Sequence, residues 1–345
     1  MVPQAPSSQY APDTAEAGSD PVPTATSSRK QRLVELPTYR GDYLQKNNIY
    51  FVLPEDAETA LPDWAAKDCD EILSAPSPAR RHSAMNVEGL QDMQRGDADV
   101  REVDILRWLE KNLFPDDDDI RKLGLRLIGC MPFKRAYLPG GDAPNPVSEP
   151  VPDLTYGYTL KETCVPFTST QLTASKAMDP ERGKPGSSDL AFPFLIVEGK
   201  VDAPKKSCLK VGENQCLGAS ATCVSIINRL NSLLLLKCEG AKKVRSAIFS
   251  IAVNQDVARL YVSWMGDDDI YYMKRICLVD LWLEAGRRDL ARYAANIMDW
   301  GSGTRFKDIQ RALDIISDEG RKTSSVKAKA RDITPDTHSS KRQRR

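Results

Sequence analysis

Residues 189–200 read Asp-Leu-Ala-Phe-Pro-Phe-Leu-Ile-Val-Glu-Gly-Lys, an apolar run that ends in a carboxylate and an amine. Such a run, rich in aromatic and branched residues, predicts a buried strand in the core of a sheet, with Pro193 near its start. Because side chains alternate across a strand, Glu198 and Lys200 should point to the same face. Gly199 between them would let another backbone or a ligand come close. Two opposite charges at the tip of such a strand indicate a site of chemistry.

Composition limits the class of protein. The chain has 345 residues and is 41% hydrophobic, which is enough for one large domain or two modest ones. Its first residues show neither the basic nor the apolar region of a secretory signal, so we expect none, and we expect no apolar segment to approach the length needed to span a membrane. The eight cysteines form no C-x-x-C pair, which favours free thiols over disulfides or zinc. We therefore expect an intracellular globular protein that is not secreted and does not contact a membrane.

Histidine content excludes several mechanisms. The chain has only two histidines, His82 and His338, and the second lies in the C-terminal tail. A Ser-His-Asp triad or a His-rich metal site would have to be built around His82 alone. Any chemistry should therefore use carboxylates and lysine.

The two ends of the chain differ from its middle. Residues 1–32, rich in Pro, Ala, Ser and Thr, predict a disordered N-terminal tail, and residues 33–79 an N-terminal segment that packs on the core. The main domain is expected over 80–319. Residues 320–345 predict a basic disordered tail, which is either a solvated arm or a nuclear-import signal or nucleic-acid tether.

Hydrophobic periodicity predicts a mixed α/β domain. The expected helices span 61–73, 83–93, 100–113, 209–237, 283–298 and 305–317, and the expected strands span 123–133, 152–160, 189–200, 247–253, 258–264 and 270–279. The four aspartates at 116–119 suit a helix start better than a metal site, because consecutive residues rarely converge on one ion.

Asp153 stands at the entrance of the strand at 152–160, upstream of Glu198 and Lys200. If the two strands are neighbours, two carboxylates lie beside one lysine. Mg²⁺ takes one or two protein carboxylates and keeps its other positions for water and substrate phosphate. The ion would polarise a phosphodiester, and Lys200 would orient or help deprotonate the attacking water. The alternative is a structural salt bridge in an unrelated α/β protein.

The pattern also resembles a known superfamily. Pro152-Asp153, Glu198-Gly199-Lys200 and Gln215 are similar to the motif of the PD-(D/E)XK nucleases. The longer phrases at 47–50, 152–158 and 194–200 resemble more closely a fungal family of PD-(D/E)XK nuclease-like proteins of unsettled function. The resemblance covers roughly residues 39–300.

This resemblance implies a restriction-endonuclease-like core, with a central mixed β-sheet flanked by helices. It also implies a Mg²⁺ or Mn²⁺ cofactor and nucleic acid, DNA or RNA, as partner. The implied ligands are Asp153, Glu198 and the Gly199 carbonyl, with Lys200 activating water and Gln215 supporting the site. The superfamily often adds a glutamate from the N-terminal helix, for which Glu88 is the first choice and Glu102 the second.

Other residues near the site have two interpretations. Lys205 and Lys206 would contact phosphate or belong to a solvated turn. Trp264, Tyr271 and Tyr272 could stack on bases, but at strand positions they are expected in the core. Two functions follow: a Mg²⁺-dependent nuclease, or a catalytically inactive module of the same fold that binds nucleic acid or protein.

Overall fold

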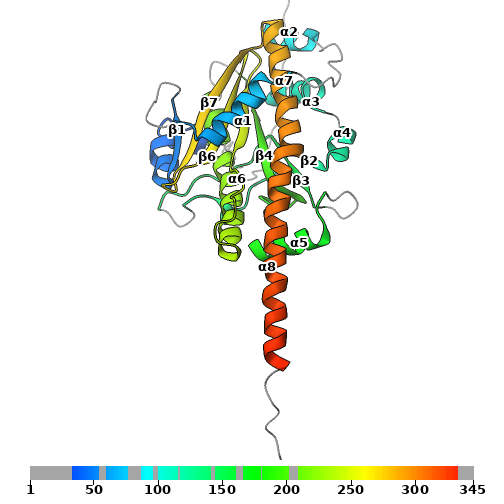
Figure 1. Ribbon diagram of the computed structural model, residues 1–345. Helices are drawn as coiled ribbons and strands as arrows, with labels where there is room; N and C mark the ends of the chain where they lie inside the picture. Colours follow the sequence, from blue (N-terminus) through cyan, green and yellow to red (C-terminus); the bar gives the residue numbers. More distant parts are fainter. Residues whose placement is uncertain are drawn as a thin grey trace, which may run out of the picture. The chain divides into compact units, whose positions relative to one another are not determined.

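The computed structural model describes residues 33–53, 60–76, 87–95, 100–115, 117–140, 144–160, 166–179, 181–201 and 209–332. They belong to one compact unit that begins at Leu33 (Figure 1). Residues 1–32 and 333–345, which the sequence predicts as parts of the two tails, lie outside this description.

The centre of the fold is a seven-stranded mixed sheet. Its strands lie in the order β1-β7-β6-β5-β4-β3-β2, and only the pairs β1/β7 and β4/β5 are parallel among those described. The strands are β1 (Ile49–Val52), β2 (Leu125–Gly129), β3 (Leu154–Thr159), β4 (Leu190–Gly199), β5 (Ile248–Val253), β6 (Val257–Met265) and β7 (Tyr271–Asp280). The predicted mixed α/β class is confirmed, and the strands expected at 247–253 and 258–264 form the antiparallel β5/β6 pair.

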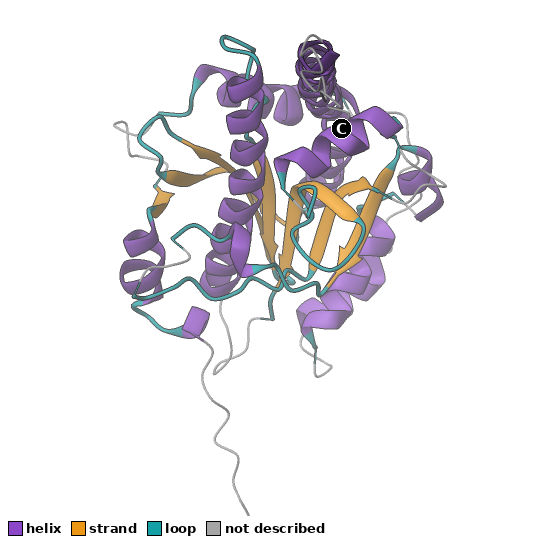
Figure 2. Cartoon of the chain, turned by 90° about the horizontal axis from the view of Figure 1, so that it is seen from below, coloured by secondary structure: helices purple, strands orange, loops and turns teal. Residues whose placement is uncertain are grey.

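Helices lie on both faces of this sheet (Figure 2). They are α1 (Asp63–Ser74), α2 (Val87–Arg95), α3 (Glu102–Asn112), α4 (Asp117–Lys122), α5 (Ser169–Met178), α6 (Leu209–Lys237), α7 (Glu284–Trp300) and α8 (Phe306–Asp332). Short 3-10 or π-helical turns occupy Leu33–Glu35, Arg40–Leu44, Gln45–Asn47, Arg135–Tyr137 and Gly301–Arg305. The aspartate run indeed starts a helix, α4, in which Asp118 and Asp119 pair with Arg121 and Lys122.

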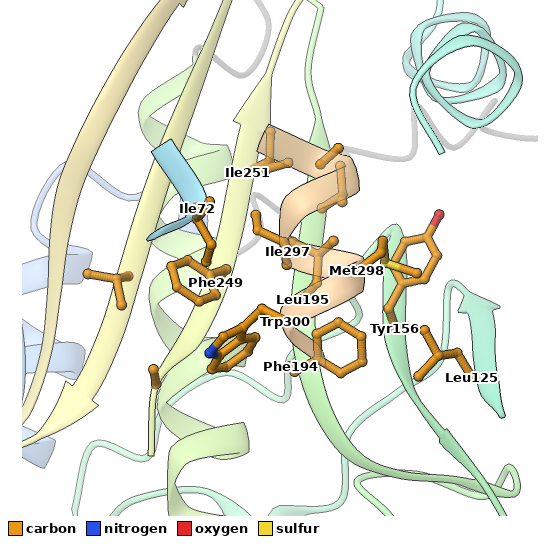
Figure 3. Packing of buried hydrophobic residues seen from close by; sticks show 14 of the residues in the cluster. Ile72, Leu125, Tyr156, Phe194, Leu195, Phe249, Ile251, Ile297, Met298 and Trp300 are labelled. Carbon is orange, nitrogen blue, oxygen red and sulfur yellow. The ribbon is translucent and has the colours of Figure 1, made fainter. Parts of the chain in front are cut away.

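Alternating side chains of β4 pack against different helices. Ile196 lies in a cluster with α6 residues such as Ala219 and Val224. Leu195 and Val197 face the opposite side and join the cluster that contains α7 (Figure 3). All ten residues of β4 are buried, as the continuous apolar run predicts.

Helix α6 corrects one expectation from the sequence. By length and composition it could cross a membrane, so the expectation that no segment approaches that length is wrong. In the fold, 61% of its most apolar window is buried. Its small and apolar side chains pack on the sheet, so its hydrophobicity is that of a core helix.

Further elements lie at both ends of the expected main domain. Strand β1 and helix α1, from the predicted packing segment 33–79, join the same sheet and core, and the Asn296 amide donates to the Ile72 carbonyl at 2.8 Å. Helix α8 continues past Gly320 to Asp332 and beyond the sheet (Figure 1). The disordered tail predicted from Gly320 is therefore wrong up to Asp332, because Lys, Arg and Ala there favour helix over coil.

Strand β4 contains a bulge near its start. The pairing with β3 shifts register between Tyr156 and Tyr158. Phe192, with a positive φ of 46°, and Pro193 lie in this irregular part. Proline lacks an N–H, so a bulge tolerates it where a regular ladder would not. Beyond the bulge the two strands pair regularly up to Val197.

A close contact joins the turn at Gly301–Arg305 to the sheet. The Tyr158 hydroxyl donates to the Gly301 carbonyl at 2.6 Å, and a Cβ at Gly301 would overlap the ring of Phe194. A Cβ at Gly303, in the same turn, would meet nothing within 4 Å.

We predict that Gly301→Ala lowers the free energy of unfolding by about 1–3 kcal/mol, because the core cannot accept the extra methyl group without shifting. Gly303→Ala is the matched control and should be neutral or slightly stabilising. Urea unfolding followed by circular dichroism measures both. Equal effects in the two variants would contradict this packing.

Candidate functional site

The proposed site lies where β3 and β4 meet at one edge of the sheet. Glu198 and Gly199 are the last residues of β4, and Lys200 follows them. Asp153 immediately precedes β3, and Leu154 pairs with Val197. This antiparallel register places Asp153 opposite Glu198, so both side chains point to the same face.

The Lys200 amine is the centre of the contacts. Its Nζ lies 3.4 Å from Glu198 Oε2 and 3.6 Å from Asp153 Oδ2, and it donates to the Gly199 carbonyl at 2.7 Å. The Gly199 N–H in turn donates to Asp153 Oδ2 at 2.8 Å. The structure therefore brings together the three charged residues that the sequence singled out.

The group is largely withdrawn from solvent. The exposed fractions of the side chains are 1% for Glu198, 4% for Lys200 and 17% for Asp153. Burial raises the pKa of Glu198 well above its usual range, the Lys200 charge lowers it, and the Asp153 charge raises it further. Burial lowers the pKa of Lys200, but Glu198 and Asp153 outweigh that effect and raise it overall. Lys200 is therefore an ammonium held by two carboxyl groups.

A third carboxylate reaches the site from α3. Glu102, the first residue of that helix, places Oε2 3.8 Å from Lys200 Nζ and remains 43% exposed. Gly199 allows the helix to approach, because a Cβ there would lie 3.0 Å from Leu106 of α3. Glu102, the second choice from the sequence, is thus brought to the site, whereas the side chain of Glu88, the first choice, lies outside the described part of the structure.

Helix α6 covers the site from the face of the sheet opposite to α3. A Cβ at Gly212 would lie 3.0 Å from the Lys200 side chain. Cys216, one turn later, has its pKa raised by burial and by the Glu198 charge, so it too faces the site. Neither residue was among the expected site residues, since the cysteines were expected to be free thiols and Gly212 has no side chain to suggest a role; only their i, i+4 spacing is visible in the sequence.

The supporting role expected of Gln215 is not observed. Within the part of the chain that the structure describes, its Oε1 is buried without a hydrogen-bond partner, and no hydrogen bond joins it to Asp153, Glu198 or Lys200. Lys205 and Lys206, the expected phosphate contacts, lie outside the described residues. Trp264 is buried, as expected of a core residue, and its ring stacks on Tyr272 at 5.5 Å. Tyr271 and Tyr272 are only half-buried.

The residues present fit one kind of metal site. Among the described residues, no group of three or more His, Cys, Asp or Glu side chains could hold an ion. Asp153 and Glu198 nevertheless offer hard oxygens, and Glu198 Oε1 is buried without a hydrogen-bond partner in the same set of residues. Mg²⁺ needs only one or two protein carboxylates and keeps several waters. The arrangement therefore fits Mg²⁺ or Mn²⁺ bound by two carboxylates and the Gly199 carbonyl, not a closed structural site.

Comparison with known families gives one match. Residues 98–313 match the family described as Domain of unknown function (DUF7924). The chain belongs to the DUF7924 family. The DUF7924 match begins just before α3 and ends within α8, so it contains Glu102, Asp153, Glu198 and Lys200, whereas β1 and α1 precede it. No curated protein and no solved structure matches the chain.

We predict that Lys200→Met destabilises the fold by about 3–5 kcal/mol, because it leaves buried carboxylates without their counter-charge. The double variant Glu198→Gln/Lys200→Met should lose less stability than the summed losses of the two single variants, because a glutamine at position 198 needs no cation beside it. Urea unfolding of the four proteins measures this coupling. Lys210→Met, at an exposed position of α6, is the control and should change stability by less than about 0.5 kcal/mol. If the stability losses of the two single variants simply add in the double variant, Glu198 and Lys200 do not interact as described.

Proposed function

We propose that this DUF7924 protein is a Mg²⁺- or Mn²⁺-dependent nuclease that hydrolyses phosphodiester bonds. The observation that supports it most is the position of the Lys200 amine, 3.4 Å from Glu198 and 3.6 Å from Asp153 at the end of a buried strand. Buried ion pairs contribute little net stability, and strongly shifted pKa values cluster at functional sites, so this group favours a chemical role over a stabilising one.

The roles of the residues follow from their surroundings. Asp153, Glu198 and the Gly199 carbonyl would hold the divalent ion. When bound there, such an ion polarises a phosphodiester and lowers the pKa of a coordinated water. Lys200, whose raised pKa keeps it charged, would donate a hydrogen bond that orients this water and offsets negative charge on the phosphate. It is better suited to this than to accepting a proton.

Glu102 is the exposed member of the group and would lie on the substrate side. Its carboxylate is 43% exposed, unlike those of Asp153 and Glu198. It could hold a water of the ion's hydration shell without binding the ion directly.

One observation favours a second candidate, a catalytically inactive nuclease-fold module. The Lys200 amine already pairs with both carboxylates and donates to the Gly199 carbonyl, so the protein itself supplies a cation at the place where the metal ion would bind. Such a module would bind nucleic acid or protein without needing a divalent ion at this place.

Cleavage assays on the purified full chain test the proposal, with labelled single-stranded DNA, duplex DNA and RNA as substrates. We predict cleavage in Mg²⁺ or Mn²⁺, none with chelator, and a loss of at least about 10²-fold in Asp153→Asn and in Lys200→Ala. Glu284→Gln, at an exposed position of α7, is the control and should retain activity.

Two results would contradict this function. Full activity in both site variants would place the chemistry elsewhere. Nucleic-acid binding that survives Lys200→Ala, without cleavage and without a calorimetric signal for Mg²⁺ or Mn²⁺ in the wild type, would instead establish the inactive module.

A further inference from the structure

A groove of about 520 Å³ runs between α3 and the edge of the sheet formed by β2 and β3. Arg107 and Lys111 of α3 line one side of it, and Gly129 at the end of β2 lines the other. Phe114 and Tyr156 form its floor, and their rings lie 5.0 Å apart. In Figure 3 the Tyr156 hydroxyl points away from the labelled apolar side chains of the core.

The groove borders the candidate site on two sides. The N–H of Cys130, the residue after Gly129, donates to the Asp153 carbonyl at 3.1 Å. A Cβ at Gly129 would lie 3.3 Å from that same carbonyl. On the other side, the helix that carries Arg107 and Lys111 begins at Glu102, which reaches Lys200. The groove therefore adjoins the candidate site through the backbone of Asp153 and through helix α3.

The charge of the groove suits an anion. Arg107 and Lys111 are one helical turn apart and so lie on the same side of α3. Glu110 also lines the groove, which leaves two cations against one carboxylate. Arg107 is 71% exposed, and its ion pair with Asp104, at 3.8 Å, is too long and too exposed to hold it firmly. Both cations can therefore turn toward a phosphate.

The floor of the groove indicates which part of a nucleic acid it would contact. Tyr156 is 0% exposed and Phe114 is 8% exposed, so neither ring offers a face on which a base could stack. Two cations above a closed aromatic floor suit the sugar-phosphate backbone instead, and contacts of that kind do not depend on base sequence.

We propose that this groove binds the phosphate backbone of the substrate strand beside the scissile phosphate, an inference that rests on the proposed nuclease function. Arg107 and Lys111 follow Glu102 by five and nine residues (107 − 102 and 111 − 102) along α3. At about 1.5 Å per residue they lie ~7.5 and ~13.5 Å from the start of the helix. Phosphates of one strand advance about 3.4 Å per nucleotide along the axis, so the contacts fall roughly two to four nucleotides from the cleaved bond.

Binding measurements test this groove separately from catalysis. The full chain is titrated into labelled single-stranded and duplex 20-mers in EDTA, and again in Ca²⁺, over a series of salt concentrations, with fluorescence anisotropy as the readout. In Arg107→Gln/Lys111→Gln we expect at least a tenfold loss of affinity. For single strands, the plot of log K against log[salt] should become less steep by about 1.4, because two phosphate contacts are lost.

The matched control is Arg121→Gln/Lys122→Gln on the neighbouring helix α4. It makes the same change in net charge, but these two cations are already paired with Asp118 and Asp119. Its affinity should stay within about twofold of the wild type. If the protein cleaves, the groove variant should raise KM while kcat is kept, and the control should change neither.

Three results would overturn the proposed role of the groove. They are equal losses of affinity in the two double variants, no loss of affinity in the groove variant, and no binding of nucleic acid by the wild type in either buffer. A failure of the proposed function looks different. Binding that depends on Arg107 and Lys111, with no cleavage in Mg²⁺ or Mn²⁺, would support the groove and refute the nuclease.

Discussion

The burial of Glu198 and Lys200 at the end of one strand is the constraint on which the rest of the structure depends. Removing charged groups from water costs several kcal/mol per ion, even after the protein relaxes around them. Here the cost is offset by mutual pairing, by Asp153 and by the Gly199 carbonyl. The pairing requires β3 and β4 to meet in one register, and the bulge near Phe192 and Pro193 allows the apolar part of β4 to reach that register.

Two glycines enclose this ion group from opposite faces of the sheet. Gly199 admits α3 and brings Glu102 to the site, whereas Gly212 of α6 makes room for the Lys200 side chain. The site is therefore shielded on both faces, and its exposed carboxylate lies on the helix that also lines the groove. The same helix, α3, therefore both covers the ion group and lines the groove beside it.

Much of this arrangement could be predicted from the sequence because it depends on local periodicity. The apolar run at 190–197 predicted β4, and the alternation of side chains predicted that Glu198 and Lys200 share a face. The position of Asp153 could be stated only conditionally, because register depends on a bulge that no local pattern reveals. The choice between Glu88 and Glu102 depends on how α3 packs at Gly199. On α6 the structure adds Gly212 and Cys216 to the surroundings of the site, and only the packed helix reveals which of its residues approach Lys200 and Glu198.

The most direct test of the central claim is a crystal structure of the full chain grown with Mn²⁺, with the ion located by its anomalous scattering. We expect an ion about 2.1 Å from the carboxylates of Asp153 and Glu198, with water completing its shell and the Lys200 amine moved off the Gly199 carbonyl. The peak should vanish in Glu198→Gln. An empty site at saturating Mn²⁺, with the amine still hydrogen-bonded to Gly199, would contradict it.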